Sequence, residues 1–283
     1  MRYHSPPPEL LRRPARVLYP LLGFGLVAYA ALLGGLFFFQ RQLLYFPDKT
    51  RPGLAGLEQL GVREAVLSTE DGLSLLSWYL PPHPGRPVIA YFHGNGGHIG
   101  YRIERLLRFA REGYGVLMPE YRGYGGNPGT PTETGFYADA RAALDFLERE
   151  GVAPNRLVVY GESLGSAVAV ELATQREVAG LILEAPPTSV AEVAQCHFPY
   201  VPAARMVIDR FDSRLRIGRV TAAILVLHGE RDRVVPIRFG RALFEAAPEP
   251  KEGWFVPEAG HEDLARYGGL DAAVAFIERR LGG

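Results

Sequence analysis

Three polar side chains, each placed shortly after a separate apolar run, have the types and the order needed for nucleophilic catalysis. They are Ser163 after Leu157–Tyr160, Asp232 after Ala223–Leu227, and His261 after Gly253–Val256. A serine hydroxyl becomes a strong nucleophile when an imidazole takes its proton, and a carboxylate fixes the imidazole tautomer. If the runs are parallel strands, their carboxyl ends bring the three side chains to one edge of a sheet. The sequence therefore predicts a catalytic triad of Ser163, His261 and Asp232.

The serine lies in Gly161-Glu162-Ser163-Leu164-Gly165, the Gly-x-Ser-x-Gly pattern of a nucleophile elbow between a strand and a helix. Glycines are required at the flanking positions because a Cβ in so sharp a turn would clash. The sequence leaves other candidates open for the carboxylate of the triad, namely Glu230, Asp263, Asp209 and Asp212.

A second glycine-rich stretch, His93-Gly94-Asn95-Gly96-Gly97, follows the apolar run Val88–Phe92. Such a loop lets backbone N–H groups approach a developing oxyanion, and we expect those of Asn95 and Leu164 to do so. Leu164 also begins a predicted helix, whose dipole favours negative charge there. We interpret His93 and His228 as structural and His98 as a loop residue. No spacing of His, Cys and carboxylates suggests a metal site, and the predicted chemistry needs no cofactor.

The rest of the chain alternates apolar runs with helical patterns. After an expected hairpin (Val62–Thr69 and Leu73–Leu80), the runs are Val88–Phe92, Gly115–Pro119, Leu157–Tyr160, Gly180–Leu183, Ala223–Leu227 and Gly253–Val256. The helical patterns lie near Tyr101–Arg111, Glu133–Arg149, Ser163–Gln175, Ile237–Ala247 and Glu262–Arg280. This alternation predicts an α/β fold, with a mostly parallel sheet covered on both faces and an antiparallel N-terminal hairpin.

Residues 186–219 break the alternation, because they are rich in Pro and aromatic residues and lack a strand pattern. The stretch is longer than a connection between a strand and a helix requires. We interpret it as a small cap over the site; a decorated surface loop is the alternative. The residues of this cap that are candidates for lining a pocket are His197, Phe198, Tyr200 and Met206.

Residues 17–39 form a run of 23 residues without a charged side chain. At about 1.5 Å per residue, a helix of this length spans the ~30 Å core of a bilayer. We therefore expect a basic tail (1–16), a transmembrane helix (17–39), a connector (40–61) and a catalytic domain (62–283). A signal peptide cleaved near Ala28-Tyr29-Ala30 and a buried core helix are the alternatives.

The formal net charge of the 283-residue chain is zero, but it is unevenly distributed. Residues 1–51 contain seven Lys or Arg and two Asp or Glu, and the remaining residues contain 24 and 29. A slightly acidic body argues against a nucleic-acid partner. Four cations precede the apolar run and three follow it, so the positive-inside rule places the catalytic domain outside the cytoplasm. The sequence predicts no oligomeric state.

Taken together, the motifs resemble those of the α/β-hydrolases over residues 62–283. They are Gln42–Pro47, His93–Gly97, Tyr121–Gly125, Gly161–Gly165, His228–Asp232 and Gly260-His261. The combination is similar to a membrane-anchored branch with one N-terminal helix, related to the bud-emergence-suppressor proteins and to the α/β-hydrolase-domain depalmitoylases. Glu120 and Asn127 depart from this branch, which more often has Asp and Ser there, and we expect both to alter the pocket rim. The resemblance implies a serine hydrolase with an acyl-enzyme intermediate.

The expected activity is hydrolysis of acyl esters or thioesters by a membrane-anchored enzyme. Lipid-like or long-chain substrates are favoured, because an anchor holds the site near the bilayer and the cap is rich in apolar residues and Arg. The alternatives are a serine peptidase or amidase, a short-chain esterase, and a catalytically idle interaction protein that uses the fold as a scaffold.

Overall fold

The computed structural model describes residues 13–54 and 56–281, so residues 1–12 of the expected basic tail lie outside the described residues. The chain divides into two compact units, Met1–Leu43 and Leu44–Gly283. The first contains helix α1 (Arg13–Phe38) and most of the short helix α2 (Gln40–Leu44). Within α1, the 20 residues Tyr19–Phe38 have a mean hydropathy of 2.1, and none of this stretch is buried inside the protein. It is long and apolar enough to cross a bilayer.

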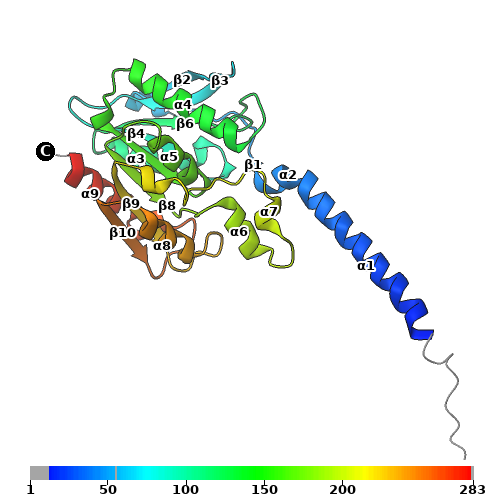
Figure 1. The fold of residues 1–283 in the computed structure, drawn as a ribbon. Coiled ribbons are helices and arrows are strands. Elements are labelled where there is room, and N and C mark those ends of the chain that lie inside the picture. The colour runs from blue at the N-terminus through cyan, green and yellow to red at the C-terminus, as the bar shows by residue number, and fades with distance from the viewer. Residues whose placement is uncertain (1–12, 55, 282–283) are drawn as a thin grey trace, which may run out of the picture. The chain divides into compact units, whose positions relative to one another are not determined.

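The second unit is built on an eight-stranded sheet with the order β10-β9-β8-β7-β4-β6-β3-β2 (Figure 1). Its strands are β2 (Arg63–Ser68), β3 (Ser74–Leu80), β4 (Val88–Phe92), β6 (Gly115–Pro119), β7 (Leu157–Glu162), β8 (Gly180–Glu184), β9 (Ala223–Gly229) and β10 (Lys251–Val256). The six strands from β6 to β10 in this order are parallel, and β3 joins β6 antiparallel. β2 and β3 form the predicted hairpin at one edge. The predicted α/β architecture is confirmed.

Helices cover both faces of this sheet (Figure 1). They are α3 (Ile103–Ala110), α4 (Glu133–Arg149), α5 (Leu164–Ala173), α8 (Ile237–Ala246) and α9 (Gly269–Leu281). The side chains of β4 alternate between two cores, as the period of a strand requires: Val88, Ala90 and Phe92 pack with α4, α5 and α8, while Ile89 and Tyr91 pack with α3 and α9. Both faces of the central strands are therefore apolar, which explains their continuous hydrophobic runs.

The expected cap lies between β8 and β9. Every residue from 186 to 219 is described, and the stretch contains α6 (Val190–His197), α7 (Ala203–Met206) and a 3-10 turn (Ile217–Arg219) but no strand. Phe211 is fully buried and packs against the rings of Phe136 and Tyr137 in α4, at centroid distances of 6.2 and 5.8 Å. The cap is thus fixed to the body through an aromatic side chain.

A second, two-stranded sheet lies apart from the large one. It pairs β1 (Phe46–Pro47) in parallel with β5 (Gly96–Gly97), with Phe46 opposite Gly96 and Pro47 opposite Gly97. The 3-10 turns Leu57–Leu60, Ile99–Arg102, Pro154–Arg156 and Leu264–Tyr267 complete the described elements. The first residues of the body therefore contact the glycine-rich stretch that follows β4.

Candidate active site

Ser163 sits at the turn between β7 and α5 with a strained backbone, φ 51° and ψ −116°. A Cβ added to Gly161 would lie 2.4 Å from Gly165 O, and one added to Gly165 would lie 2.2 Å from Phe92 O. Both neighbours are backbone atoms, so neither can move aside cheaply. The Gly-x-Ser-x-Gly pattern is therefore explained by close packing of the turn against itself and against the end of β4.

The structure brings together the three side chains that the sequence singles out at strand ends. His261 Nε2 lies 3.0 Å from Ser163 Oγ, and His261 Nδ1 lies 2.7 Å from Asp232 Oδ2. The other oxygen of Asp232 accepts hydrogen bonds from the N–H groups of Val234 and Val235, each at 2.8 Å. The carboxylate is thus fixed by its own loop while it orients the imidazole.

The other carboxylates that the sequence left open have different partners. Glu230 pairs with Arg241 at 2.6 Å, and Asp263 accepts a hydrogen bond from Gly260 N at 2.7 Å. Asp209 and Asp212 lie in the cap, where they bond to Tyr45 and Arg210.

Burial, hydrogen bonds and neighbouring charges shift the pKa values of His261 and Asp232. Burial alone would lower the pKa of His261, but the hydrogen bond and charge of Asp232 outweigh it, and with Glu162 and Glu184 they raise the pKa. Burial would raise the pKa of Asp232, but hydrogen bonds from His228 and His261 hold it well below its usual range. The result is an ionised carboxylate beside an imidazole whose pKa is raised.

His228 holds Asp232 from the other side. Its Nε2 lies 2.8 Å from Val235 O and 3.1 Å from Asp232 Oδ2, and the ring is fully buried. Because a carbonyl oxygen only accepts, Nε2 must carry the hydrogen. A Cβ on Gly240 would lie 2.1 Å from His228 Nδ1, so α8 packs directly on this ring. These contacts agree with the structural role expected for His228.

The loop after β4 lies beside the elbow. A Cβ on Gly94 would be 3.5 Å from Ser163 Cβ. Asn95 is held by Tyr124, whose hydroxyl donates to Asn95 O at 2.8 Å and to its Oδ1 at 3.1 Å. Within the described part of the chain, neither Asn95 N nor Leu164 N donates a hydrogen bond to another backbone group.

Glu120 and Asn127 do not act at a pocket rim as the sequence interpretation expected. Glu120 is fully buried and accepts hydrogen bonds from His93 Nε2 at 3.0 Å and from Ile99 N at 2.8 Å. Asn127 bonds to Leu76 N at 2.8 Å and to Glu120 O at 3.0 Å. Both side chains accept from buried backbone N–H groups, and Glu120 connects His93 with Ile99, on either side of the glycines of the loop.

Sequence reasoning missed a buried charge cluster next to the elbow. Its members are Glu162, Glu184, Arg102, Arg105, Tyr91 and Tyr160. Arg102 donates to Glu162 Oε1 at 2.9 Å and to Gly96 O at 3.0 Å, and Arg105 donates to Glu184 Oε1 at 2.8 Å. Burial would raise the pKa of Glu162, but the charges of Arg105 and Arg102 lower it to about 2. The sequence did contain a signal for this cluster. A carboxylate that directly follows a buried apolar run is itself expected to be buried, and a buried carboxylate needs a cation beside it.

The cap residues expected to line a pocket are placed differently from one another. His197 donates from Nε2 to Val234 O at 2.8 Å, which links the cap to the loop that carries Asp232. Phe198 and Tyr200 are 58% and 90% exposed, and Met206 is half-buried in α7.

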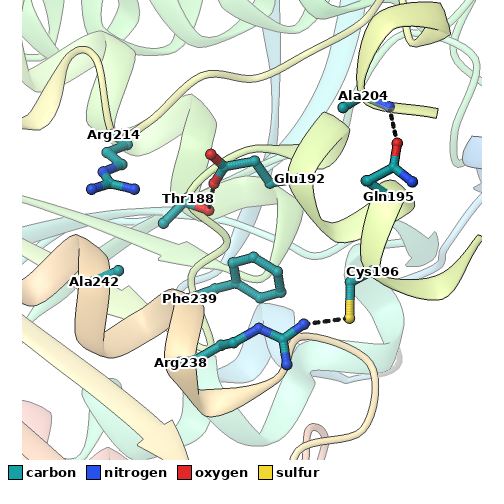
Figure 2. A pocket seen from close by; sticks show the side chains of 9 residues that line it. All are labelled: Thr188, Glu192, Gln195, Cys196, Ala204, Arg214, Arg238, Phe239 and Ala242. Atoms are coloured by element: carbon teal, nitrogen blue, oxygen red, sulfur yellow. Dashed lines mark hydrogen bonds between the residues drawn. The ribbon is translucent and has the colours of Figure 1, made fainter. Parts of the chain in front are cut away.

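An open cavity of about 470 Å³ lies between the cap and α8, with Arg238 hydrogen-bonded to Cys196 at one side (Figure 2). Neither the triad side chains nor the four expected cap residues line it. Among the described residues, no group of three or more His, Cys, Asp and Glu is arranged to hold a metal.

Comparison with known proteins places this chain in a family. A family model described as serine aminopeptidase, S33, matches residues 83–218. An uncharacterized protein of Mycobacterium tuberculosis is 42% identical over 244 residues, covering 84% of this chain and 87% of that protein. Human α/β-hydrolase domain-containing protein 17B is 34% identical over 197 residues, covering 69% of this chain and 67% of that protein. The chain belongs to the α/β-hydrolase superfamily.

The fold comparison agrees with this assignment. An esterase of Pyrococcus furiosus superposes on the α/β-hydrolase with a TM-score of 0.68 at 19% identity, covering 84% of this chain and all of the esterase. At that identity the likeness concerns the fold alone. The matched family segment includes the elbow and the glycine-rich loop but ends before Asp232 and His261. The chain is a hydrolase of the α/β type, and its substrate has to be argued from its own residues.

Replacing Gly165 by Ala tests the packing of the elbow. The added Cβ would lie 2.2 Å from Phe92 O, so we expect a loss of about 2–4 kcal/mol in the free energy of unfolding, in the upper range for one substitution. Urea unfolding followed by tryptophan fluorescence measures it. Gly218→Ala is the control, because a Cβ there meets nothing within 4 Å. Equal stability of the two variants would contradict this account of the elbow.

Proposed function

We propose that this α/β-hydrolase is a serine hydrolase that cleaves carboxylic esters or thioesters through an acyl-enzyme intermediate. The observation that carries the proposal is the continuous chain of contacts from Ser163 Oγ through His261 to Asp232, at 3.0 and 2.7 Å. These distances lie within the reach that proton transfer between nucleophile and base requires. The strained elbow holds the hydroxyl at the carboxyl end of the sheet, where sites form in this architecture.

In the proposed mechanism, Ser163 Oγ attacks the substrate carbonyl while His261 Nε2 takes the hydroxyl proton. The tetrahedral oxyanion accepts hydrogen bonds from the N–H groups of Asn95 and Leu164. His261 then gives its proton to the departing alcohol or thiol, which leaves an acyl ester on Ser163. Water, deprotonated by His261, attacks this ester, and the returning proton restores the serine hydroxyl.

The charges around His261 suit this sequence of steps. Imidazolium forms during attack, and the ionised Asp232 stabilises it, with Glu162 and Glu184 acting at longer range. Asp232 keeps its charge because three of its four contacts come from its own loop and from His228. The base is thus strengthened without its carboxylate partner taking the proton.

We also propose that α1 anchors the enzyme in a membrane, with the catalytic unit outside the cytoplasm. Its length and its mean hydropathy of 2.1 over Tyr19–Phe38 support an anchor, and a cleaved signal sequence has the same properties. The orientation rests on the excess of Arg before the apolar run.

Long-chain acyl groups are the substrates we propose first. The cap exposes Phe198, Tyr200 and Ile208, which are 58%, 90% and 51% exposed, and such side chains suit contact with acyl chains. Two other cap residues, one apolar and one basic, have partners within the protein. Phe211 packs on α4, and Arg216 pairs with Glu171 at 2.6 Å.

Amide hydrolysis is the second candidate, because the family model that matches residues 83–218 is described as a serine aminopeptidase. The same triad can cleave esters and amides. A free substrate amino group would need an acidic partner close to Ser163. Glu162 precedes Ser163, and the backbone oxygen of Glu184 accepts from Ser163 N, but their carboxylates are already paired with Arg102 and Arg105, which favours the ester proposal.

Hydrolysis of a matched acyl series tests the reaction and its substrate together. The series runs from acetyl to palmitoyl as oxygen esters and thioesters, with aminoacyl amides beside it and Ser163→Ala as the blank. We expect turnover to rise with chain length and to disappear in the variant to within background, a loss of about 10⁵-fold or more. A maximum at acetyl would indicate a short-chain esterase, activity confined to amides would favour the peptidase, and full activity of Ser163→Ala would refute the mechanism.

The pH dependence of kcat/KM tests the role of His261. The base must be neutral, and its pKa lies above the ordinary value of 6.5, so activity should rise with pH and reach half its maximum above 6.5. Asp232→Asn removes the charge that raises this pKa, so the midpoint should move to lower pH while the plateau falls by up to about 10⁴-fold. Asp263→Asn is the control, because it keeps an acceptor for Gly260 N. If the midpoint moves only in Asp263→Asn, then Asp232 is not the carboxylate that raises the pKa of His261.

Membrane anchoring is tested by fractionation. The full chain should stay with membranes after an alkaline carbonate wash, and Val27→Asp with Ala30→Asp should release it, because each central charge costs about 2.5–3.5 kcal/mol. Leu60→Asp, exposed and outside α1, should leave the distribution unchanged. A mature chain that begins at residue 31 would contradict the anchor, and a C-terminal reporter active only in the cytoplasm would overturn the orientation.

A further inference from the structure

The first residues of the catalytic unit contact the loop that we propose holds the oxyanion. We call Leu44–Asp48 the junction segment, because it directly follows the unit that contains α1. Its strand β1 pairs with Gly96 and Gly97. Asn95 Nδ2 donates to Leu44 O, and Asp48 N donates to Gly97 O at 3.1 Å. The junction segment thus borders the loop from Asn95 to Gly97 along its whole length.

The junction segment is itself fixed to the body at several points. Tyr45 is 5% exposed, its ring packs edge-on against Phe136 at 5.4 Å, and its hydroxyl donates to Asp209 Oδ2 at 3.1 Å. At the other end, Asp48 O accepts from Gly125 N at 2.8 Å, and Asp48 Oδ2 accepts from Tyr101 OH at 2.8 Å. A strand held at both ends is a rigid support for whatever pairs with it.

The glycine-rich loop needs such a support. Glycine has more conformational freedom than any other residue, and this loop has two in succession after Asn95. A Cβ on Gly96 would meet nothing within 4 Å, so side-chain packing does not hold that residue on this side. Oxyanion donors act well only when they are held in place before the charge develops. Hydrogen bonds from the junction segment, from Tyr124 and from Arg102 supply that order.

We infer that the junction segment is a positioning element of the active site, and that Tyr45 is the residue that holds this segment in place. It acts through the loop, since it aligns Asn95 N–H for the oxyanion. The inference rests on the proposed function, because it assigns a catalytic consequence to that loop. It predicts that turnover depends on a residue far from Ser163 in sequence, at the point where the chain leaves α2.

Tyr45→Ala in the full, detergent-solubilised chain tests the inference. Active sites are first counted by stoichiometric labelling of Ser163 with a fluorophosphonate, and ester turnover is then expressed per labelled site. We expect kcat per site to fall about 10-fold or more, short of the ~10²–10³-fold loss of a whole oxyanion donor, with KM within about twofold. Tyr45→Phe keeps the ring on Phe136 and should restore most of the rate.

A matched variant separates positioning from stability. Tyr79 is 2% exposed and packs edge-on against Phe146 at 5.2 Å, so Tyr79→Ala removes a similar aromatic pair elsewhere in the core. It should lower the melting temperature comparably and leave kcat per site unchanged. Asn95→Ala removes the bond to Leu44 O and keeps the backbone donor. If both residues act through the same loop, the double variant should lose less kcat per site than the product of the two single fold-losses.

The outcomes distinguish the inference from the proposed function. If the wild-type chain is labelled at Ser163 and turns over ester, while Tyr45→Ala loses no more kcat per site than Tyr79→Ala, the inference is wrong and the proposed function stands. Multiplicative effects of Tyr45→Ala and Asn95→Ala would also overturn it, since the two would act independently. A wild-type chain that neither labels nor turns over would overturn both.

Discussion

The backbone of Ser163 is the constraint on which the rest of this structure depends. A non-glycine residue at φ 51° and ψ −116° is strained by about 1–3 kcal/mol, so its surroundings must hold it there. They do so from three directions: Ser163 N donates to Glu184 O at 2.8 Å, Gly161 packs on the first turn of α5, and Gly165 packs on the end of β4. The order of the central strands follows from this need, because β7 must lie between β4 and β8 for all three contacts to exist.

The charged cluster beside the elbow fixes the geometry of the site more than it adds to the stability of the protein. Two carboxylates and two guanidinium groups are largely buried beside the elbow, and such clusters contribute little net stability because each ion loses hydration. Their arrangement nevertheless fixes two parts of the site at once. Arg102 bonds to Glu162, next to Ser163, and to Gly96 O, in the glycine-rich loop. The segment that carries Ser163 and the loop of the proposed oxyanion donors are thereby connected through one planar, five-donor side chain.

Local patterns in the sequence predicted the elements well, because strands and helices have periods that a single stretch reveals. Predicted runs such as Val88–Phe92 and Glu133–Arg149 match β4 and α4, and strand order explains why Ser163, Asp232 and His261 meet. Contacts between distant side chains have no such signature. From the sequence alone, Arg102 would be interpreted as a solvated helix residue, because its partner Glu162 lies 60 residues away. The junction segment likewise reads as part of a connector, because only the fold places it beside a loop 51 residues later.

The bond between Tyr45 and Asp209 joins residues 164 positions apart, so it can form only late in biosynthesis. Translation at ~5–20 residues per second leaves roughly 10–30 s between the emergence of the two side chains from the ribosome. The tyrosine is among the first residues of the body to be made, and its partner belongs to the cap, one of the later parts. His261 follows later still. A nascent chain therefore lacks part of this site through most of its synthesis, and Ser163, Asp232 and His261 come together only after the C-terminal strands have folded.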